Sequence, residues 1–204
     1  MSSGRTPFDL STDRVESLAD GIFGFAMTLL VLNLSLPDRI EPTSAALSKL
    51  LLGQARNFYA YILSFLLLGN LWAAHHRQHQ FINRTDTQHV WINIFLLMFV
   101  ALVPFTTTLI SDFGDTVLAE AIFALNLFLL SALFLFNWLH ATRNHRLVNN
   151  DLDDATIRVM TRRMLVLPAV PLLVLVVCPF FPSYSSFLYV LIPVLYWRRV
   201  FRRR

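Results

Sequence analysis

Residues 14–36 read RVESLADGIFGFAMTLLVLNLSL, and this stretch decides the class of protein. It begins with charged residues and continues as an apolar run of the length that crosses a bilayer, about 20 residues. Wound at about 100° per residue, it separates small side chains from bulky ones. The small sector holds Ser17, Gly21, Gly24, Thr28 and Ser35, and the bulky stripe holds Phe25, Leu29, Leu32 and Leu36. Small residues let another helix approach closely, so the stretch predicts a transmembrane helix that packs tightly on one side.

The bulky stripe has three candidate environments: lipid, another helix, or an axis shared with other subunits. Periodicity alone favours a stripe that faces lipid or the protein core. The choice therefore depends on the rest of the chain.

Composition extends this interpretation to all 204 residues. Hydrophobic residues make up 55% of the chain and charged residues only 15%, whereas soluble domains carry about 25% charge. Apolar runs recur along the sequence and leave no room for a sizeable soluble domain. We therefore predict an all-α membrane protein, a single domain over residues 1–204 with six transmembrane helices. Their approximate ranges are 14–36, 56–76, 88–110, 116–140, 158–181 and 183–200.

The positive charges predict the orientation. With six crossings, all 17 Lys and Arg residues except Arg39, Lys49 and Arg56 fall on one side, and positive residues mark the cytoplasmic side. We therefore expect a multi-pass protein of the cytoplasmic membrane, with both termini in the cytoplasm. The C-terminal cluster can meet anionic lipid headgroups; it comprises Arg198, Arg199, Arg202, Arg203 and Arg204. Orientation explains the net charge of +4, so nucleic-acid binding is not expected.

Enzymatic and metal chemistry find little support in the sequence. Cys178 is the single cysteine, which excludes an intramolecular disulfide and a cysteine-based metal site. His75 and His79 are one helical turn apart, but no H-E-x-x-H arrangement accompanies them. A glycine-rich phosphate loop and a nucleophile elbow are also missing. We expect neither an enzyme nor a resident metal or cofactor.

Asp20 needs a partner, because a carboxylate near membrane depth is costly unless it is paired or hydrated. Arg14 lies six residues away, too far for a pair within one helix. The candidate partners stand on the same side of the bilayer in the second and third helices. They lie in the stretch Asn70-Leu-Trp72-Ala-Ala-His75-His76-Arg77-Gln-His79, and Asn93 at the start of the third helix is on the same side.

These residues carry a resemblance to a known family. Arg14-x-x-x-Leu18-Ala19-Asp20-Gly21, followed by Thr28-Leu29-Leu30, resembles the R-x-x-x-F-S-D motif and T-L-L continuation of the transmembrane protein 175 potassium channels, in their prokaryotic single-repeat branch. Trp72-x-x-His75-His76-Arg77 is similar to the second helix of that family. Asn93 and Leu102-Val103-Pro104-Phe105 are similar to its third helix.

The resemblance implies a homotetramer whose first helices line a central pore for K⁺. Phe25, Leu29 and Leu32 would form an apolar constriction, which replaces the T-V-G-Y-G carbonyl filter that this sequence also lacks. Phe25 stands where an isoleucine-like residue is usual. Thr28 and Ser35 would place hydroxyls near the axis. The resemblance also implies a bracing network in the cytoplasmic half, made of Arg14, Asp20, Trp72, His75, His76 and Asn93.

Two other functions remain open from the sequence. A proton-linked secondary transporter would use Asp20 and the second-helix histidines as its relay. A membrane scaffold without permeation would turn the bulky stripe toward lipid.

Overall fold

The computed structural model describes residues 11–34 and 43–194, and it is all-α apart from one isolated β-bridge between Ile82 and Val148. Within these residues, five helical segments are long and apolar enough to cross a membrane. They are α1 (Thr12–Leu29) with the 3₁₀ turn η1 (Leu30–Asn33), α3 (Ala55–His79), α4 (Thr87–Phe113), α5 (Val117–Thr142) with η2 (Arg143–His145), and α6 (Asp154–Met164) with α7 (Val166–Val177). The shorter elements are α2 (Ser44–Gly53), α8 (Pro182–Ser185) and η3 (Ser186–Val190). The prediction of an all-α membrane protein is thus confirmed, with five candidate spans where six were expected.

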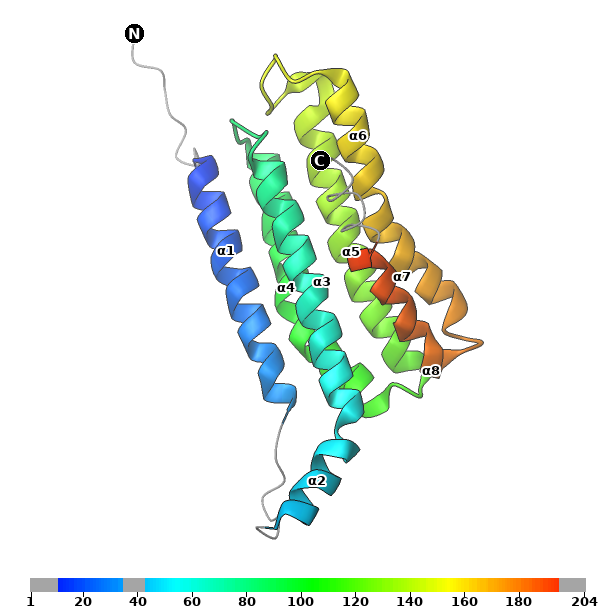
Figure 1. Cartoon of the computed structure of the whole chain (residues 1–204). Helices are drawn as coiled ribbons and strands as arrows, with labels where there is room; N and C mark the ends of the chain where they lie inside the picture. Colours follow the sequence, from blue (N-terminus) through cyan, green and yellow to red (C-terminus); the bar gives the residue numbers. More distant parts are fainter. Residues whose placement is uncertain (1–10, 35–42, 195–204) are drawn as a thin grey trace.

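The sixth expected span, 183–200, lies only partly inside the described residues. Its described part is the pair α8 and η3 followed by helical residues 191–194. In Figure 1 this part rises beside α5 and α7 from one end of the bundle. Ser35 and the C-terminal arginine cluster lie outside the described residues, so nothing is said of their structure.

The bundle has two chemically different ends. One end, at the top of Figure 1, holds the start of α1, the end of α3, the start of α4 and the end of α5. We call it the histidine end, because His75, His76, His79 and His89 all lie there. At the opposite end α2 stands away from the other helices, and none of its residues is buried.

The core lies between α3, α4, α5 and α7. Its largest fully buried side chains include Phe123, Phe134 and Trp138 on α5. Helix α1 packs at one edge against α3 and α4 (Figure 1) through Ala19, Phe23 and Ala26, and the following η1 turn does so through Leu30. One side of α1 therefore faces away from the other helices of its own chain.

Side-chain caps and prolines determine the helix boundaries. Asp153 accepts a hydrogen bond from the backbone N–H of Thr156 at 3.3 Å and starts α6 four residues before the expected start at 158. The same segment breaks after Met164, where Pro168 explains the interruption: its ring would clash with the carbonyl of residue 164 in a continuous helix. Asp86 caps α4 in the same way, by accepting from the N–H of His89 at 2.7 Å.

At the opposite end, polar contacts hold the helices together. Arg56 of α3 forms two hydrogen bonds, of 2.9 and 2.7 Å, with the carboxylate of Asp115. Thr108 of α4 donates to the side-chain oxygen of Asn33 at 2.8 Å, and this hydrogen bond joins the end of η1 to α4. Glu120 is buried beside a cavity of about 210 Å³, and its Oε2 has no partner among the described residues.

Candidate functional site

The outward face of α1 carries the residues expected at a constriction. Phe25 is 65% exposed and Leu32 is 70% exposed, whereas Leu29 between them is half-buried. Leu32 lies in the 3₁₀ turn η1, so the bulky stripe leaves the α-helical winding after Leu29. Within one chain, the stripe therefore faces the surroundings at Phe25 and Leu32 and only partly at Leu29.

The small sector borders this face and is unpacked in the single chain. A Cβ atom at Gly21 or Gly24 would meet no other atom within 4 Å. Thr28 is exposed, and its hydroxyl donates to the carbonyl of Phe25 at 2.7 Å. The two glycines therefore have no packing role inside the chain, and their small size leaves room for a neighbour from outside it.

Two polar contacts join α1 to α3 at the histidine end. The indole N–H of Trp72 donates to Oδ1 of Asp20 at 2.8 Å. One turn away on each helix, Nδ1 of His76 lies 2.8 Å from Oε1 of Glu16. Asp20 thus has the interhelical partner that its position required. Arg14 is exposed at the start of α1 and forms no ion pair within the described residues.

Behind α1, a buried polar network crosses three helices. Nε2 of His75 donates to Oδ1 of Asn93 at 3.0 Å, and Nδ2 of Asn93 donates to the carbonyl of His89 at 2.9 Å. The same Nδ2 lies 3.4 Å from Oδ1 of Asn137, whose own amide contacts Gln78 at 3.4 Å. All five side chains are buried, and buried polar groups are costly unless they are paired, so this network fixes the packing of α3, α4 and α5.

His75 and His79 do not form a metal site in this arrangement. Their rings stack with centroids 4.1 Å apart, and Nδ1 of His79 donates to the carbonyl of His75 at 3.1 Å. Over the described ranges, no three His, Cys, Asp or Glu side chains form a group that could hold a metal ion.

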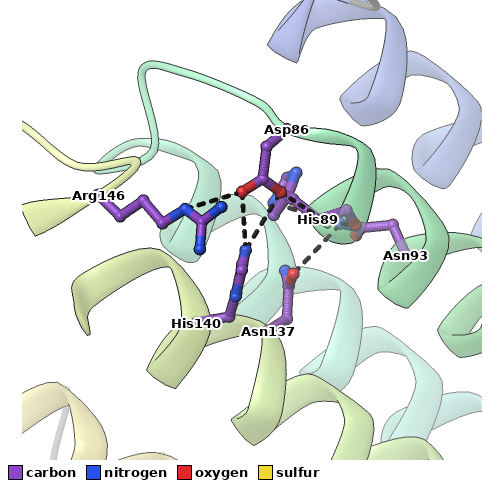
Figure 2. A network of polar contacts seen from close by, with 6 residues as sticks. All are labelled: Asp86, His89, Asn93, Asn137, His140 and Arg146. Atoms are coloured by element: carbon purple, nitrogen blue, oxygen red, sulfur yellow. Dashed lines mark hydrogen bonds and ion pairs between the residues drawn. The ribbon is translucent and has the colours of Figure 1, made fainter. Parts of the chain in front are cut away.

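Asp86 is the centre of a second cluster, at the rim of the histidine end. Figure 2 shows it between His140 and Arg146, with Oδ2 at 3.0 Å from Nε2 of His140 and 3.1 Å from Nε of Arg146. Partial burial opposes ionisation, but the N–H of His89 together with His140 and Arg146 outweighs it and lowers the pKa of Asp86 below its usual value of 3.8. The carboxylate therefore stays charged and holds the start of α4 against the end of α5.

Replacing Asp86 with alanine should destabilise the protein by about 1–2 kcal/mol, because it removes a helix cap worth about 1 kcal/mol and a partly exposed ion pair worth up to about 1 kcal/mol. Asp86→Asn should cost less, since the amide oxygen still caps α4. Because the pKa of Asp86 is lower in the folded protein, the ion-pair contribution is present above about pH 4 and disappears as the pH falls further. Thermal unfolding in detergent at pH 7 and pH 3.5 would test both points. A difference between wild type and Asp86→Asn that grows on acidification would contradict this account.

The fold and this site define a class: a multi-pass α-helical membrane protein in which one peripheral helix carries an exposed apolar face and is joined to the next helix by polar contacts. Residues 14–104 match the family model described as the endosomal/lysosomal potassium channel TMEM175. A potassium channel of Streptomyces collinus is 31% identical over 149 residues, which cover 71% of each chain. A potassium channel of Chamaesiphon minutus is 32% identical over 77% of this chain and 79% of that one.

Solved structures agree with these sequence matches. The crystal structure of a lysosomal potassium-selective channel TMEM175 homolog from Chamaesiphon minutus superposes with a TM-score of 0.80 at 25% identity, covering 92% of this chain and 97% of that one. The chain therefore belongs to the TMEM175 family of potassium channels, as its motifs indicated. The family model and these relatives are described as channels, so the expectation of a non-enzyme is confirmed.

Sequence reasoning found some of the site and missed the rest. Of the candidate partners of Asp20, Trp72 contacts it, whereas His75 and Asn93 hydrogen-bond to each other, a pair that the sequence did not predict. The contact of Glu16 with His76 and the participation of Gln78, His89 and Asn137 were not anticipated. The sequence does carry one signal for Gln78 and Asn137: both are polar residues inside apolar spans, and such residues usually face the interior of the bundle.

Proposed function

We propose that this chain is the subunit of a homotetrameric, potassium-permeable cation channel, in which the first helix lines a central pore and Phe25, Leu29 and Leu32 form the constriction. The observation that carries the proposal is the outward face of α1, where Phe25 and Leu32 are exposed in the single chain. Around a fourfold axis, each such residue becomes a ring of four. Rings of apolar side chains close a pore by dewetting, and widening them admits cations. Thr28, on the same exposed face, and Ser35 would supply hydroxyls near the axis.

Support for assembly comes from the small sector of α1. Gly21 and Gly24 leave open space beside an exposed apolar face, and small residues allow helices to approach closely. In the tetramer, a helix of the adjacent subunit fills this space. Of the residues expected to brace the cytoplasmic half, which are Arg14, Asp20, Trp72, His75, His76 and Asn93, Trp72 and His76 hold α1 through Asp20 and Glu16. His75 and Asn93 join α3 to α4 behind it.

Membrane orientation completes the proposal. The arginine-rich histidine end faces the cytoplasm, and both termini lie on that side once residues 183–200 form the sixth span. The C-terminal arginine cluster then meets anionic headgroups of the cytoplasmic membrane.

A proton-linked secondary transporter is the alternative from the sequence, and the geometry favours it less. Asp20 bonds to Trp72, whereas His75 bonds to Asn93, so the carboxylate and the buried histidines belong to separate contacts. A non-permeating scaffold is the third candidate. Cysteine labelling at position 29 distinguishes it, because a scaffold would expose that position to lipid and a channel would expose it to water.

Recording from the purified protein in planar bilayers under opposed K⁺ and Na⁺ gradients tests the channel proposal. We expect discrete single-channel currents that reverse near the K⁺ equilibrium potential. Flux at transporter turnover rates that follows the proton gradient would overturn it in favour of the alternative.

Replacing Gly21 with leucine should abolish the tetramer while the subunit remains folded. The larger side chain has space within its own chain but would occupy the room needed by the adjacent subunit. Size-exclusion chromatography with light scattering in mild detergent measures the assembly, and circular dichroism measures the helix content. Gly53→Leu on α2, where a Cβ also has open space, is the control. A tetramer that persists in Gly21→Leu would place the subunit contact elsewhere.

A further inference from the structure

A polar surface feature lies away from α1, between the start of α4 and the end of α5. A cavity of about 500 Å³ opens there, at the rim of the histidine end. Its polar lining includes Gln88, His140, Arg143 and Arg146. The bracing contacts of α1 do not involve these residues, so this cavity has no part in the channel proposal.

The cavity has excess positive charge. Arg146 contacts Asp86 through Nε, and its side chain is 58% exposed. Arg143 is exposed one turn earlier and forms no ion pair among the residues that the structure describes. Asp86 compensates at most one of the two arginines, so the remaining charge favours an anion. Figure 2 shows three further titratable side chains beside Arg146: those of Asp86, His140 and His89.

A left-handed turn of the backbone separates the two arginines. Asn144 and His145, which separate them, have φ values of 54° and 53°. This left-handed conformation is uncommon for residues other than glycine and costs free energy. The turn it creates brings Arg143 and Arg146 to the lining of one cavity.

An apolar strip continues from the cavity toward the middle of the bundle. Phe136 and Leu139 of α5 line the cavity and are exposed. On α4, Gln88, Trp91 and Phe95 follow at i, i+3 and i+7 and so share one face. Trp91 and Phe95 are about half exposed, at 53% and 49%. Tryptophan is typical of the membrane–water interface, which places the arginines at headgroup level and the strip at the level of the acyl chains.

We propose that this site binds an anionic glycerophospholipid, with its phosphate between Arg143 and Arg146 and its acyl chains along the strip of Trp91, Phe95, Phe136 and Leu139. A free anion would use the arginines but leave the strip uncovered. A second protein copy would cover the strip but bury the arginine charge unpaired, which is costly. A lipid with a negative headgroup satisfies both parts, and basic pockets between transmembrane helices are suited to such headgroups.

Native mass spectrometry of the detergent-solubilised protein with added phosphatidylglycerol, against phosphatidylcholine of the same chain length, tests the site. The double variant Arg143→Gln/Arg146→Gln should bind phosphatidylglycerol about thirtyfold more weakly, because each arginine near the surface contributes on the order of 1 kcal/mol and about 1.4 kcal/mol corresponds to a factor of ten. Binding of phosphatidylcholine should not change. The matched control is Arg158→Gln/Arg162→Gln, which removes the same charge from exposed positions on α6.

Three results would overturn the proposal. The double variant could keep its affinity for phosphatidylglycerol, or the control could lose as much, which would indicate general attraction to basic surface. In a separate measurement of thermal unfolding, inorganic phosphate could raise the unfolding midpoint of the protein as much as phosphatidylglycerol does, which would indicate a free-anion site. If the double variant does not fold, the single variant Arg143→Gln decides, because that side chain has no ion pair to lose among the described residues. We expect about fivefold weaker binding of phosphatidylglycerol from it.

Discussion

Phe25→Ala is expected to raise single-channel conductance severalfold and to weaken the preference for K⁺ over Na⁺. In the proposed tetramer the substitution removes four aromatic rings from the axis, which widens and wets the constriction. Phe25 is largely exposed in the single chain, so the loss of the ring leaves the core intact. Leu29→Ala and Leu32→Ala should act in the same direction. Conductance and reversal potential in planar bilayers under K⁺ and Na⁺ gradients measure both effects.

Leu118→Ala is the matched control for Leu32→Ala. Both leucines are 70% exposed in the single chain, but Leu118 lies at the start of α5, away from α1. We expect wild-type currents from the control. If Leu32→Ala and Phe25→Ala also give wild-type currents from correctly assembled tetramers, the outward face of α1 does not line the pore.

Among the substitutions discussed, Asn93→Leu is expected to lower the free energy of unfolding most, by about 3 kcal/mol. It leaves Nε2 of His75 and Oδ1 of Asn137 buried without the partner that Asn93 supplied, and such groups cost about 1–3 kcal/mol each. Leucine has the same number and branching of side-chain heavy atoms as asparagine, so it keeps the shape of the side chain while it removes the hydrogen bonds. The midpoint of thermal unfolding in detergent measures the effect.

Asn70→Leu is the control for this substitution. Asn70 lies on α3 and donates to the carbonyl of Leu66 in its own helix at 2.7 Å, so its loss leaves no side chain of another helix unpaired. Equal shifts of the unfolding midpoint for the two variants would mean that the network around Asn93 does not stabilise the bundle.

The spans were predictable because they depend on local properties of the sequence. Long apolar runs identify α3, α4 and α5 whatever they pack against, and the observed bounds lie within a few residues of the expected ones. The expected span 158–181 did not include the break between α6 and α7. Pro168 indicates this break, but a criterion based on hydrophobicity ignores the missing N–H of proline. The η1 turn after Leu29 carries no comparable signal, and its geometry depends on contacts with α3 and α4.

The polar partners were predictable only in part. The need of Asp20 for a donor follows from the cost of a carboxylate at membrane depth, and Trp72 was among the few donors on that side. Which amide meets Asn93 depends instead on the register of α4 against α5. That register places Asn137 beside Asn93, and no local pattern in either helix specifies it.

Helix α1 is held near both of its ends: by Trp72 and His76 at the histidine end, and by Thr108 at Asn33. A rod fixed at both ends can bow or twist, but it cannot slide along its axis without breaking those contacts. Phe25 and Leu29 lie between the two attachments. In the proposed channel, opening would therefore be a sideways bending of the four α1 helices, with the greatest displacement near the middle of each helix. The bending stiffness of α1 would set the work needed to widen the pore.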